Sequence, residues 1–313
     1  MSRPLLLAYR ALGLGDLLTA VPVLKALARA FPQHRRILAT PHALAPLARL
    51  AGAVDEVLDA SPLAPLPPAA HGADVAVNLH GRGPESHAVV RATRPHRLVA
   101  FAAAGHEGPR WRPDEHEVAR WCRLLEESGI PADPADLGLP PPPWPAPPPA
   151  VGATLIHPGA ASQARRWPPE RWAAVARAEG AAGRPVAITG SQAERPLALQ
   201  IAREAGIPPE RVLAGRTDVR ALAAAVAAAG RVACGDTGVA HLATAFGTPS
   251  VVLFGPVPPA EWGPPDIPRH RALWAGRRGD PHGDTPDAGL LEIRPAQVAD
   301  ALDAVVCPLE RTG

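Results

Sequence analysis

The stretch that decides the fold is residues 231–246, RVACGDTGVAHLATAF. It opens with an apolar run typical of a buried strand, and residues 242–246 have the composition of a helix. Asp236, Thr237 and Gly238 fall between the two, so the stretch predicts a strand, a sharp turn and the start of a helix. Such a junction presents free backbone N–H groups and the positive end of a helix dipole at the C-terminal edge of a sheet. The pattern therefore predicts a phosphate site in an open α/β fold.

A structural role explains the same residues without a ligand. In that interpretation, Asp236 or Thr237 only caps the helix, and His241 lies on one of its faces. Two further motifs favour the ligand site.

The rest of the chain has the size and pattern of two α/β domains. Of its 313 residues, 47% are hydrophobic, which is enough for two cores. Each half alternates short apolar runs with alanine-rich helical stretches, the βαβ pattern of a parallel doubly wound sheet. Between the halves, residues 139–149 (LPPPPWPAPPP) predict a polyproline connector, because proline lacks an N–H donor and fixes φ. The predicted domains are therefore 1–138 and 150–313, with 139–149 as a linker.

The apolar pattern gives an expected element order for each half. In the first half we expect strands at 4–9, 36–39, 54–58, 74–79 and 97–101, and helices at 16–30 and 115–128. In the second half we expect strands at 153–157, 185–189, 232–234 and 250–254, and helices at 169–182, 193–205, 219–229, 237–245 and 295–306. We expect two Rossmann-like domains that face each other across a cleft, each offering its strand C-termini to a ligand.

Charge and hydropathy exclude several classes of protein. A net charge of +2 argues against a general nucleic-acid binder, which would carry a much stronger basic surface. The apolar run at 5–8 is cut short by Arg10 and Asp16, so it is too brief for a signal peptide, and no segment is long enough to span a membrane. We expect a cytoplasmic protein with, at most, peripheral membrane association.

The three cysteines do not form a recognisable redox or zinc motif. Cys122, Cys234 and Cys307 are far apart in the sequence and lack C-x-x-C spacing. We expect them to be reduced residues of the cores.

The second motif, Gly13-Leu14-Gly15-Asp16, directly follows the first predicted strand. A dinucleotide fingerprint G-x-G-x-x-G would need glycine at position 18, where Leu18 stands, so the nicotinamide interpretation is weakened. What remains is a glycine turn that presents the Asp16 carboxylate at a helix N-terminus. The alternative is that Asp16 is only a helix cap.

The third motif is HPGAA at 157–161, followed by the pair Arg165 and Arg166 before a predicted helix. A turn at Gly159 after a strand, followed by two guanidinium groups, fits the binding of phosphate oxygens by fork-shaped donors. The alternative is that both arginines face solvent and Trp167 anchors the helix start by packing.

Together with other segments, these motifs resemble glycosyltransferase family 9, typified by the ADP-heptose:lipopolysaccharide heptosyltransferases. The order and spacing of the segments run through nearly the whole chain. They are GLGDLLTAVPVLKALARAFP (13–32), VDEVLDA (54–60), ADVAVNLHGRG (73–83), HPGA (157–160), RRWPPERW (165–172), AITGSQAE (187–194) and CGDTGVAHLATAFGTPSVVLFGP (234–256).

The resemblance implies a GT-B fold, with the acceptor on the N-terminal Rossmann-like domain and a nucleotide-sugar donor, ADP-heptose, on the C-terminal one. It implies an inverting reaction that needs no metal or cofactor. Asp16 matches the family's catalytic base, and Arg165 stands where the family usually carries a phosphate-binding lysine. The positions that match the family's donor site are Asp236, Thr237, Gly238 and His241, with Gln192 and Glu194 in the region that contacts the nucleoside ribose.

The chemistry of such a transfer agrees with these residue types. An acceptor hydroxyl must lose a proton as it attacks the anomeric carbon, and a carboxylate such as Asp16 can take it. The departing nucleoside diphosphate gains negative charge, which the N–H groups at Thr237 and Gly238, a helix dipole and Arg165 can stabilise without a cation. Aspartate is a weak base unless it is partly desolvated.

Some positions depart from the family pattern. Arginine at 165 keeps the charge of lysine but changes the geometry, so donor preference is expected to differ. Ala160 and Ala161 stand where some relatives carry a phosphate-binding hydroxyl, and Ser162 comes next.

Two other segments contain residue types that are typical of metal sites. The run GDPHGD at 279–284 is punctuated by glycine and proline, which predicts an exposed loop rather than a metal cluster. The run HEVAR at 116–120 lacks the second histidine of a zinc-protease helix, so we expect a solvated helix face.

The charge of one segment suggests the chemical class of the acceptor. The segment from His80 to Arg112 is rich in arginine and poor in acidic residues, which suggests an anionic or phosphorylated acceptor near Arg82. The arginines are Arg82, Arg91, Arg94, Arg97, Arg110 and Arg112, against Glu85 and Glu107. A cell-wall glycan or small-molecule acceptor stays open, as do the base and sugar of the donor, and we expect a monomer.

Two other function classes remain open. A nicotinamide-dependent oxidoreductase would share the doubly wound architecture, although the fingerprint fails at Leu18. A non-catalytic nucleotide-sugar sensor would keep residues 236–241 without needing Asp16. Loss of turnover in Asp16→Ala with donor affinity retained would exclude the sensor.

Overall fold

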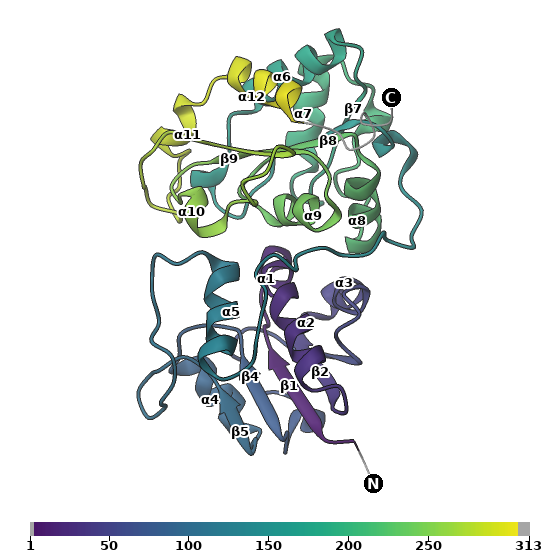
Figure 1. The fold of residues 1–313 in the computed structure, drawn as a ribbon. Coiled ribbons are helices and arrows are strands. Elements are labelled where there is room, and N and C mark those ends of the chain that lie inside the picture. The colour runs from purple at the N-terminus through teal and green to yellow at the C-terminus, as the bar shows by residue number, and fades with distance from the viewer. Residues whose placement is uncertain (1–2, 306–313) are drawn as a thin grey trace. The chain divides into compact units, whose positions relative to one another are not determined.

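The computed structural model describes residues 3–305 and divides into two compact units, Met1–Pro140 and Pro141–Gly313 (Figure 1). Each unit holds one five-stranded sheet in which every pair of neighbouring strands is parallel. Helices cover both faces of each sheet, so the expected pair of Rossmann-like α/β domains is confirmed. The division between the units falls within the predicted connector 139–149.

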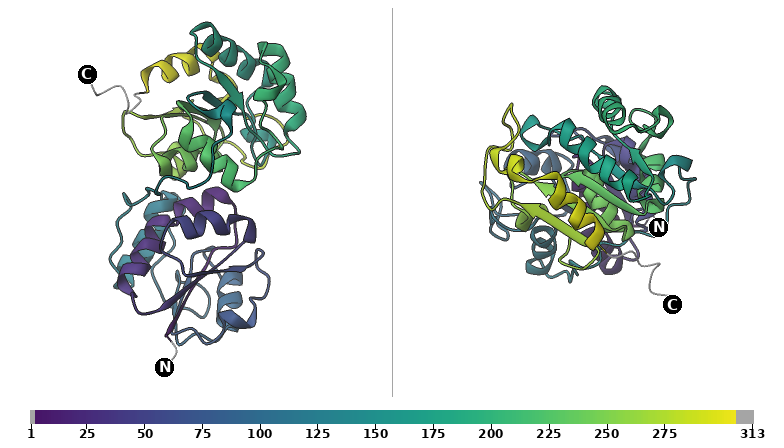
Figure 2. Two further views of the ribbon diagram at one scale, coloured as in Figure 1. Left: turned by 90° about the vertical axis from the view of Figure 1, so that its right-hand side faces the viewer. Right: turned by 90° about the horizontal axis from the view of Figure 1, so that it is seen from above.

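The sheet of the N-terminal unit has the strand order β3-β2-β1-β4-β5. Helices α2 and α5 lie on one face and α4 lies on the other (Figure 2, left). The strands are β1 Leu5–Tyr9, β2 Arg35–Thr40, β3 Glu56–Asp59, β4 Val75–Asn78 and β5 Arg97–Val99. The helices are α1 Leu14–Thr19, α2 Val21–Ala30, α3 Ala45–Leu50, α4 Glu85–Ala92 and α5 Glu117–Glu127, with short 3₁₀ turns η1 His42–Leu44 and η2 Pro68–Ala70.

The central strand β1 explains this order. Its sequence LLLAY is apolar at every position, so it suits the middle of a parallel sheet that is covered on both faces. Leu7 pairs with Ile37 of β2 on one side and with Ala76 of β4 on the other. Because parallel strands end at the same edge, the residues that follow β1 and β4 are brought close together.

The predicted single helix at 16–30 is wrong in one respect, because the structure divides it into α1 and α2. Pro22 has no N–H to donate and its ring would clash with the carbonyl four residues earlier, so a continuous helix is disfavoured there. The division leaves α1 as a short helix of 6 residues that carries Asp16 in its first turn.

The sheet of the C-terminal unit has the order β10-β9-β8-β6-β7. Helices α6, α7 and α12 pack on one face, and α8 and α9 pack on the other (Figure 1). The strands are β6 Thr154–His157, β7 Val186–Ile188, β8 Arg231–Gly235, β9 Ser250–Phe254 and β10 His270–Trp274. The helices are α6 Pro169–Ala181, α7 Arg195–Ala205, α8 Val219–Ala228, α9 Gly238–Phe246, α10 Pro259–Trp262, α11 Ala288–Glu292 and α12 Pro295–Ala304, with 3₁₀ turns η3 Pro148–Ala150, η4 Gln163–Arg165 and η5 Pro209–Arg211.

Local sequence explains where these helices begin and end. Asp218 caps α8 by accepting a hydrogen bond from the N–H of Ala221 at 2.8 Å. Helices α7 and α9 end at Gly206 (φ 70°) and Gly247 (φ 69°), in the left-handed conformation that glycine adopts without a steric cost. Trp167 is buried and packs edge-on against Trp172 at 4.9 Å between ring centroids, so its packing role is confirmed.

The expected strands all form, with ends shifted by at most two residues, but several elements were not expected. They are α3, α4, α10, α11 and β10. The last predicted helix, 295–306, corresponds to α12, and its final residue lies outside the described part of the chain. Within residues 3–305, no helix is long and apolar enough to cross a membrane.

The cysteines that the structure describes are core residues as expected. Cys122 and Cys234 are buried with free thiols, and burial raises the pKa of Cys122 to about 12. Cys307 lies outside the described residues. A thiol with such a high pKa is unreactive at neutral pH.

Candidate functional site

Asp16 lies at the C-terminal edge of the N-terminal sheet, in the first turn of α1. Its Oδ2 accepts a hydrogen bond from the N–H of Gly13 at 3.2 Å, and its Oδ1 accepts one from Arg10 Nη2 at 3.1 Å. The side chain keeps 28% of its surface exposed. Asp16 therefore does bond back to the start of the helix, yet its carboxylate is still accessible.

Burial raises the pKa of Asp16 above its ordinary value, and two neighbouring charges act in opposite directions. Arg10 favours the ionised carboxylate, whereas Glu117 disfavours it. Partial desolvation is the condition under which an aspartate becomes a stronger base. The surroundings of Asp16 meet that condition.

The glycines beside Asp16 do not need glycine's backbone freedom. Gly13 has φ −78° and ψ −177°, an extended conformation that any residue adopts, and Gly15 lies within α1. A side-chain atom on Gly13 would lie 3.5 Å from Asp16 Oδ2, which is an ordinary contact. The turn before Asp16 therefore does not depend on a left-handed backbone conformation at Gly13.

Two residues of this site were missed by the sequence analysis. Arg10 directly follows β1, and its side chain is fully buried. Glu117, the first residue of α5, is 5% exposed and Arg120 is 6% exposed. The expectation that 116–120 forms a solvated helix face is therefore wrong: ion pairs of Glu117 with Arg10 and Arg120 replace the water that would otherwise be needed. The signal in the sequence was Arg10 itself, because an arginine that directly follows a fully apolar strand is expected to have a buried partner.

In the C-terminal unit, three loops follow neighbouring strands of the sheet. The loop with Gly159 follows β6, the loop with Gln192 and Glu194 follows β7, and the run from Asp236 follows β8. Because β8, β6 and β7 are adjacent and parallel, these loops meet at one edge. The structure thus brings the predicted donor-site residues of this unit together.

The loops after β6 and β7 pack closely. A side-chain atom on Gly159 would lie 2.0 Å from Glu194 Oε1, so the absence of a side chain at Gly159 leaves the space that the Glu194 carboxylate occupies. Glu194 Oε2 accepts a hydrogen bond from the N–H of Ser191 at 2.7 Å. His157 Nδ1 lies 3.0 Å from Thr189 Oγ1, and burial lowers the pKa of His157, against the opposing charge of Glu194. Gln192 is exposed beside Gly215.

The two arginines after β6 have different roles. Arg165 Nη1 forms an ion pair with Asp236 Oδ2 at 3.2 Å and is 27% exposed. Arg166 Nε instead donates to the carbonyl of Ala160 at 3.0 Å, which holds the loop that carries Gly159. Arg165 is thus the member of the pair that can move to an arriving anion.

The run after β8 forms the N-terminus of α9, as predicted. Thr237 caps the helix, because its Oγ1 accepts a hydrogen bond from the N–H of Val239 at 3.3 Å. Gly238 is the first helical residue, so its N–H precedes the first hydrogen bond of the helix and has no acceptor within it. His241 lies one turn later, with its ring 6.0 Å from that of Trp262. Both the capping role and the anion-binding geometry are present in one segment.

Arg82 lines a pocket of about 430 Å³ in the N-terminal unit, formed with Trp111 and residues 83–85 and 102–104. Its guanidinium makes no hydrogen bond or ion pair with any described residue. Most of the other arginines of this segment are already engaged: Arg91 donates to Gly105, Arg97 to Ser128, and Arg112 pairs with Glu127. The anionic-acceptor expectation therefore rests on Arg82.

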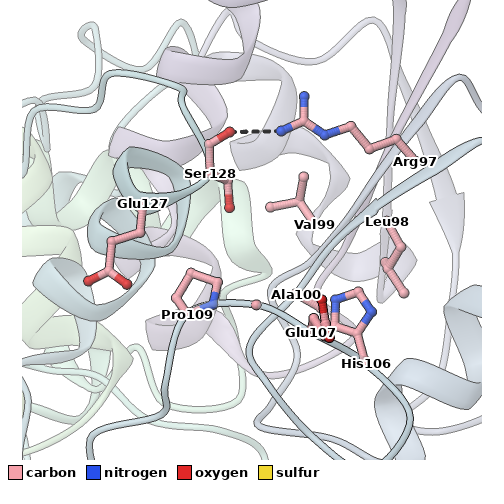
Figure 3. Close-up of a pocket in the computed structure, with 10 residues that line it drawn as sticks. Arg97, Leu98, Val99, Ala100, His106, Glu107, Pro109, Glu127 and Ser128 are labelled. Carbon is pink, nitrogen blue, oxygen red and sulfur yellow. Dashed lines mark hydrogen bonds between the residues drawn. The ribbon is translucent and has the colours of Figure 1, made fainter.

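A second pocket, of about 370 Å³, lies beside the edge strand β5 (Figure 3). It is lined by residues 97–100, 106–109, Glu127 and Ser128, and Arg97 donates a hydrogen bond to the Ser128 carbonyl at 2.7 Å. It contains none of the predicted site residues.

The segment 279–284 is an exposed loop, as expected, with Asp280 Oδ1 accepting a hydrogen bond from the N–H of His282 at 2.9 Å. No group of three or more His, Cys, Asp or Glu residues within 3–305 has a metal-binding arrangement.

Solved structures support the fold. The glycosyl transferase of family 9 from Veillonella parvula has 19% identity and a TM-score of 0.77, with 97% of each chain covered. E. coli ADP-heptose lps heptosyltransferase II has 21% identity and a TM-score of 0.74, covering 96% of this chain and 98% of its own. The E. coli heptosyltransferase WaaC with ADP has 16% identity and a TM-score of 0.72, covering 95% and 98%.

These similarities indicate a GT-B type of architecture. No curated protein matches the sequence of this chain. The model of the family described as glycosyltransferase family 9 (heptosyltransferase) matches residues 106–282, which is more than half of the chain. This segment includes Arg165, Glu194 and the run from Asp236 to His241. The chain therefore belongs to glycosyltransferase family 9 and is a glycosyltransferase.

Proposed function

We propose that the protein is an inverting glycosyltransferase that moves heptose from ADP-heptose to a hydroxyl of a glycan acceptor, with Asp16 as the general base and no metal. The observation that carries the proposal is the Asp16 carboxylate, which is partly desolvated yet 28% exposed at the strand C-termini. A base must combine raised basicity with access to the proton that it takes.

In this mechanism the acceptor oxygen attacks the anomeric carbon from the side opposite the leaving group. The new C–O bond forms as the bond between the anomeric carbon and the diphosphate oxygen breaks, and the diphosphate leaves with the electron pair. The acceptor proton passes to Asp16. Attack from the opposite side inverts the configuration at the anomeric carbon.

The donor is assigned to the C-terminal unit. The N–H of Gly238, the N-terminal end of α9 and the Arg165 guanidinium supply positive charge for the diphosphate. Asp236 Oδ2 is buried and has no hydrogen-bond partner among the described residues, so it can accept one from a donor hydroxyl. Glu194 and Gln192 lie at the same edge of the sheet, where they can form hydrogen bonds with the ribose hydroxyls. The similar WaaC structures contain ADP or ADP-2-deoxy-2-fluoro heptose.

The acceptor is assigned to the N-terminal unit, at the pocket of Arg82 and Trp111. Arg120 stacks on Trp111 with its guanidinium carbon 4.4 Å from the ring centroid, and Arg120 also pairs with Glu117. An unengaged guanidinium beside an aromatic wall suits a sugar that carries a phosphate or carboxylate. A lipopolysaccharide core fragment has this chemistry, and a neutral cell-wall glycan does not.

The test is a binding and turnover panel with magnesium omitted. ADP and ADP-heptose should raise the melting temperature, whereas UDP-sugars and NADH should not, since a ligand of the folded state stabilises it by mass action. Release of ADP from ADP-heptose should then require an acceptor. A response only to NADH would contradict the proposal, and binding of ADP-heptose without turnover on any acceptor would favour a sensor.

A further inference from the structure

Asp16 is joined to a buried ion-pair network that the proposed transfer does not itself explain. Arg10 Nη2 donates to Asp16 Oδ1 at 3.1 Å and to Glu117 Oε1 at 2.9 Å, so one nitrogen bridges two carboxylates. The same guanidinium donates through Nε to the backbone carbonyl of Asp16 and through Nη1 to that of Leu79. Arg10 therefore fixes both the side chain and the backbone of Asp16 to the end of β4.

Two residues of the same helix also donate hydrogen bonds to Glu117. Its Oε1 also accepts a hydrogen bond from Trp121 Nε1 at 2.7 Å, and its Oε2 accepts one from Arg120. The Arg10 guanidinium carbon lies 4.9 Å from the centroid of the Trp121 ring. The network thus contains two cations and two carboxylates, and its charges balance.

The two carboxylates differ in access to solvent. The side chain of Glu117 is 7% exposed and that of Asp16 is 28% exposed. A buried ion pair adds little stability compared with apolar residues of the same size, because desolvating the charges is costly. This buried pair is hydrogen-bonded through Arg10 to the accessible carboxylate of Asp16, which indicates a role in the chemistry of that carboxylate.

We propose that Glu117 and Arg10 are positioning residues for the base: Arg10 fixes the Asp16 carboxylate, and Glu117 shares the guanidinium so that Arg10 does not neutralise Asp16 alone. This inference rests on the proposed role of Asp16. Arg10 by itself would make the carboxylate easier to ionise and therefore a weaker base. Glu117 supplies the opposing negative charge while satisfying the rest of the guanidinium.

The charged groups of this network, and His80 whose pKa responds to Arg10, come from three segments. Arg10 follows β1, Glu117 and Arg120 belong to α5, and His80 follows β4. Burial and the charge of Arg10 lower the pKa of His80 to about 4, so this imidazole is neutral near pH 7. Burial raises the pKa of Glu117, but Arg10, Arg120 and Trp121 outweigh that effect and lower it, so Glu117 remains ionised. The charge that acts against Arg10 at Asp16 is therefore that of Glu117.

The inference can be tested without knowing the acceptor, by titrating the carboxyl carbon of Asp16 with NMR in protein labelled with ¹³C-aspartate. The signal is assigned by its loss in Asp16→Asn. In Glu117→Gln, which keeps an oxygen acceptor but removes the charge, the pKa of Asp16 should fall by about one unit. In Arg10→Met it should rise by a similar amount. Glu126→Gln, an exposed change on the same helix, is the matched control and should leave it unchanged.

Opposite shifts in Glu117→Gln and Arg10→Met would support the inference. A lower melting temperature in Glu117→Gln without any change in the Asp16 pKa would mean that Glu117 is only structural, and would overturn it. If Glu117→Gln does not fold, Arg10→Met decides alone, and an unshifted or lowered Asp16 pKa would overturn the inference. The proposed function fails separately, if Asp16→Asn keeps full transfer activity, because that result does not depend on the NMR shifts.

Discussion

Arg165 Nη1 lies 3.2 Å from Asp236 Oδ2, so an ion pair joins the loop after β6 to the loop after β8. Burial raises the pKa of Asp236, and Arg165 is the cation that opposes this shift. The contact lacks hydrogen-bond geometry, which leaves Arg165 able to turn toward an incoming diphosphate.

Removing this cation should weaken nucleotide binding. In Arg165→Met, we expect the Kd for ADP to rise at least tenfold, about 1.4 kcal/mol, because a charge-assisted contact to the diphosphate is lost. Isothermal titration calorimetry would measure it. Arg177→Met removes an arginine of the same unit that only donates to the carbonyl of Glu204, and it should bind ADP normally. Equal Kd values for Arg165→Met and the wild type would remove Arg165 from the donor site.

Close packing of Gly159 against Glu194 gives a second prediction. In Gly159→Ala the new methyl group would overlap the Glu194 carboxylate, so the Glu194 side chain must turn away from its present position, and ADP affinity should fall about tenfold if that position holds the donor. Gly180→Ala is the matched control, since no atom lies within 4 Å of the added methyl group and the residue belongs to α6. We expect this control to gain about 0.5–1 kcal/mol in unfolding free energy. Unchanged ADP affinity in Gly159→Ala would show that this contact is unimportant for the donor.

Glu179 gives a prediction about stability and pH. It is fully buried, Thr154 Oγ1 and Arg184 donate to it, and these partners outweigh burial and lower its pKa below the ordinary 4.5. A carboxyl group whose pKa is lowered by folding stabilises the native state above its unfolded pKa and loses that contribution as the pH falls. Glu179→Gln should therefore cost about 2 kcal/mol at pH 7, and the difference from the wild type should shrink below about pH 4.5.

Urea unfolding of Glu179→Gln between pH 3 and pH 7 would check this expectation, with the exposed Glu204→Gln as the control. A difference that stayed constant over this range would mean that the charge of Glu179 has no part in stability.

Arg82 gives a prediction about the acceptor. Arg82→Glu should raise the acceptor KM about tenfold or more for a phosphorylated glycan, with kcat nearly unchanged, because a guanidinium contact is replaced by repulsion. The dephosphorylated form of the same glycan should show little difference between variant and wild type. Arg49→Glu, an exposed change in α3, controls for the charge of the unit. An unchanged KM for the phosphorylated glycan would exclude Arg82 as an anion contact.

Much of the fold follows from local sequence patterns. The strands β1, β8 and β9 were predicted because they are apolar at nearly every position, as strands buried on both faces must be. β10 was missed because it is an edge strand: in HRALW, Arg271 and Ala272 are exposed, so the apolar run that marks a buried strand is absent. Helix α4 was missed because its sequence, ESHAVVRA, mixes polar and apolar residues and contains no long apolar run.

The site was only partly predictable. Arg165 and Glu194 lie in the loops that follow β6 and β7, and the run from Asp236 directly follows β8. The strand ends of a parallel sheet meet at one edge whatever the details of packing. The position of Arg10 after an apolar strand is a local signal that it has a buried partner, but that partner, Glu117, lies 107 positions away and no local pattern identifies it. From sequence alone, a charged residue in a helix is expected to face solvent unless its distant partner is known.

The measurement that tests the central claim most directly is the activity of Asp16→Asn with ADP-heptose and an accepting glycan. The substitution keeps the size of the side chain but removes the base, so kcat should fall by about 10²-fold or more, while the Kd for ADP stays within twofold of the wild type. Wild-type kcat should rise with pH through the raised pKa of Asp16. Full activity in Asp16→Asn, with ADP bound normally, would show that another group takes the acceptor proton and would contradict the account.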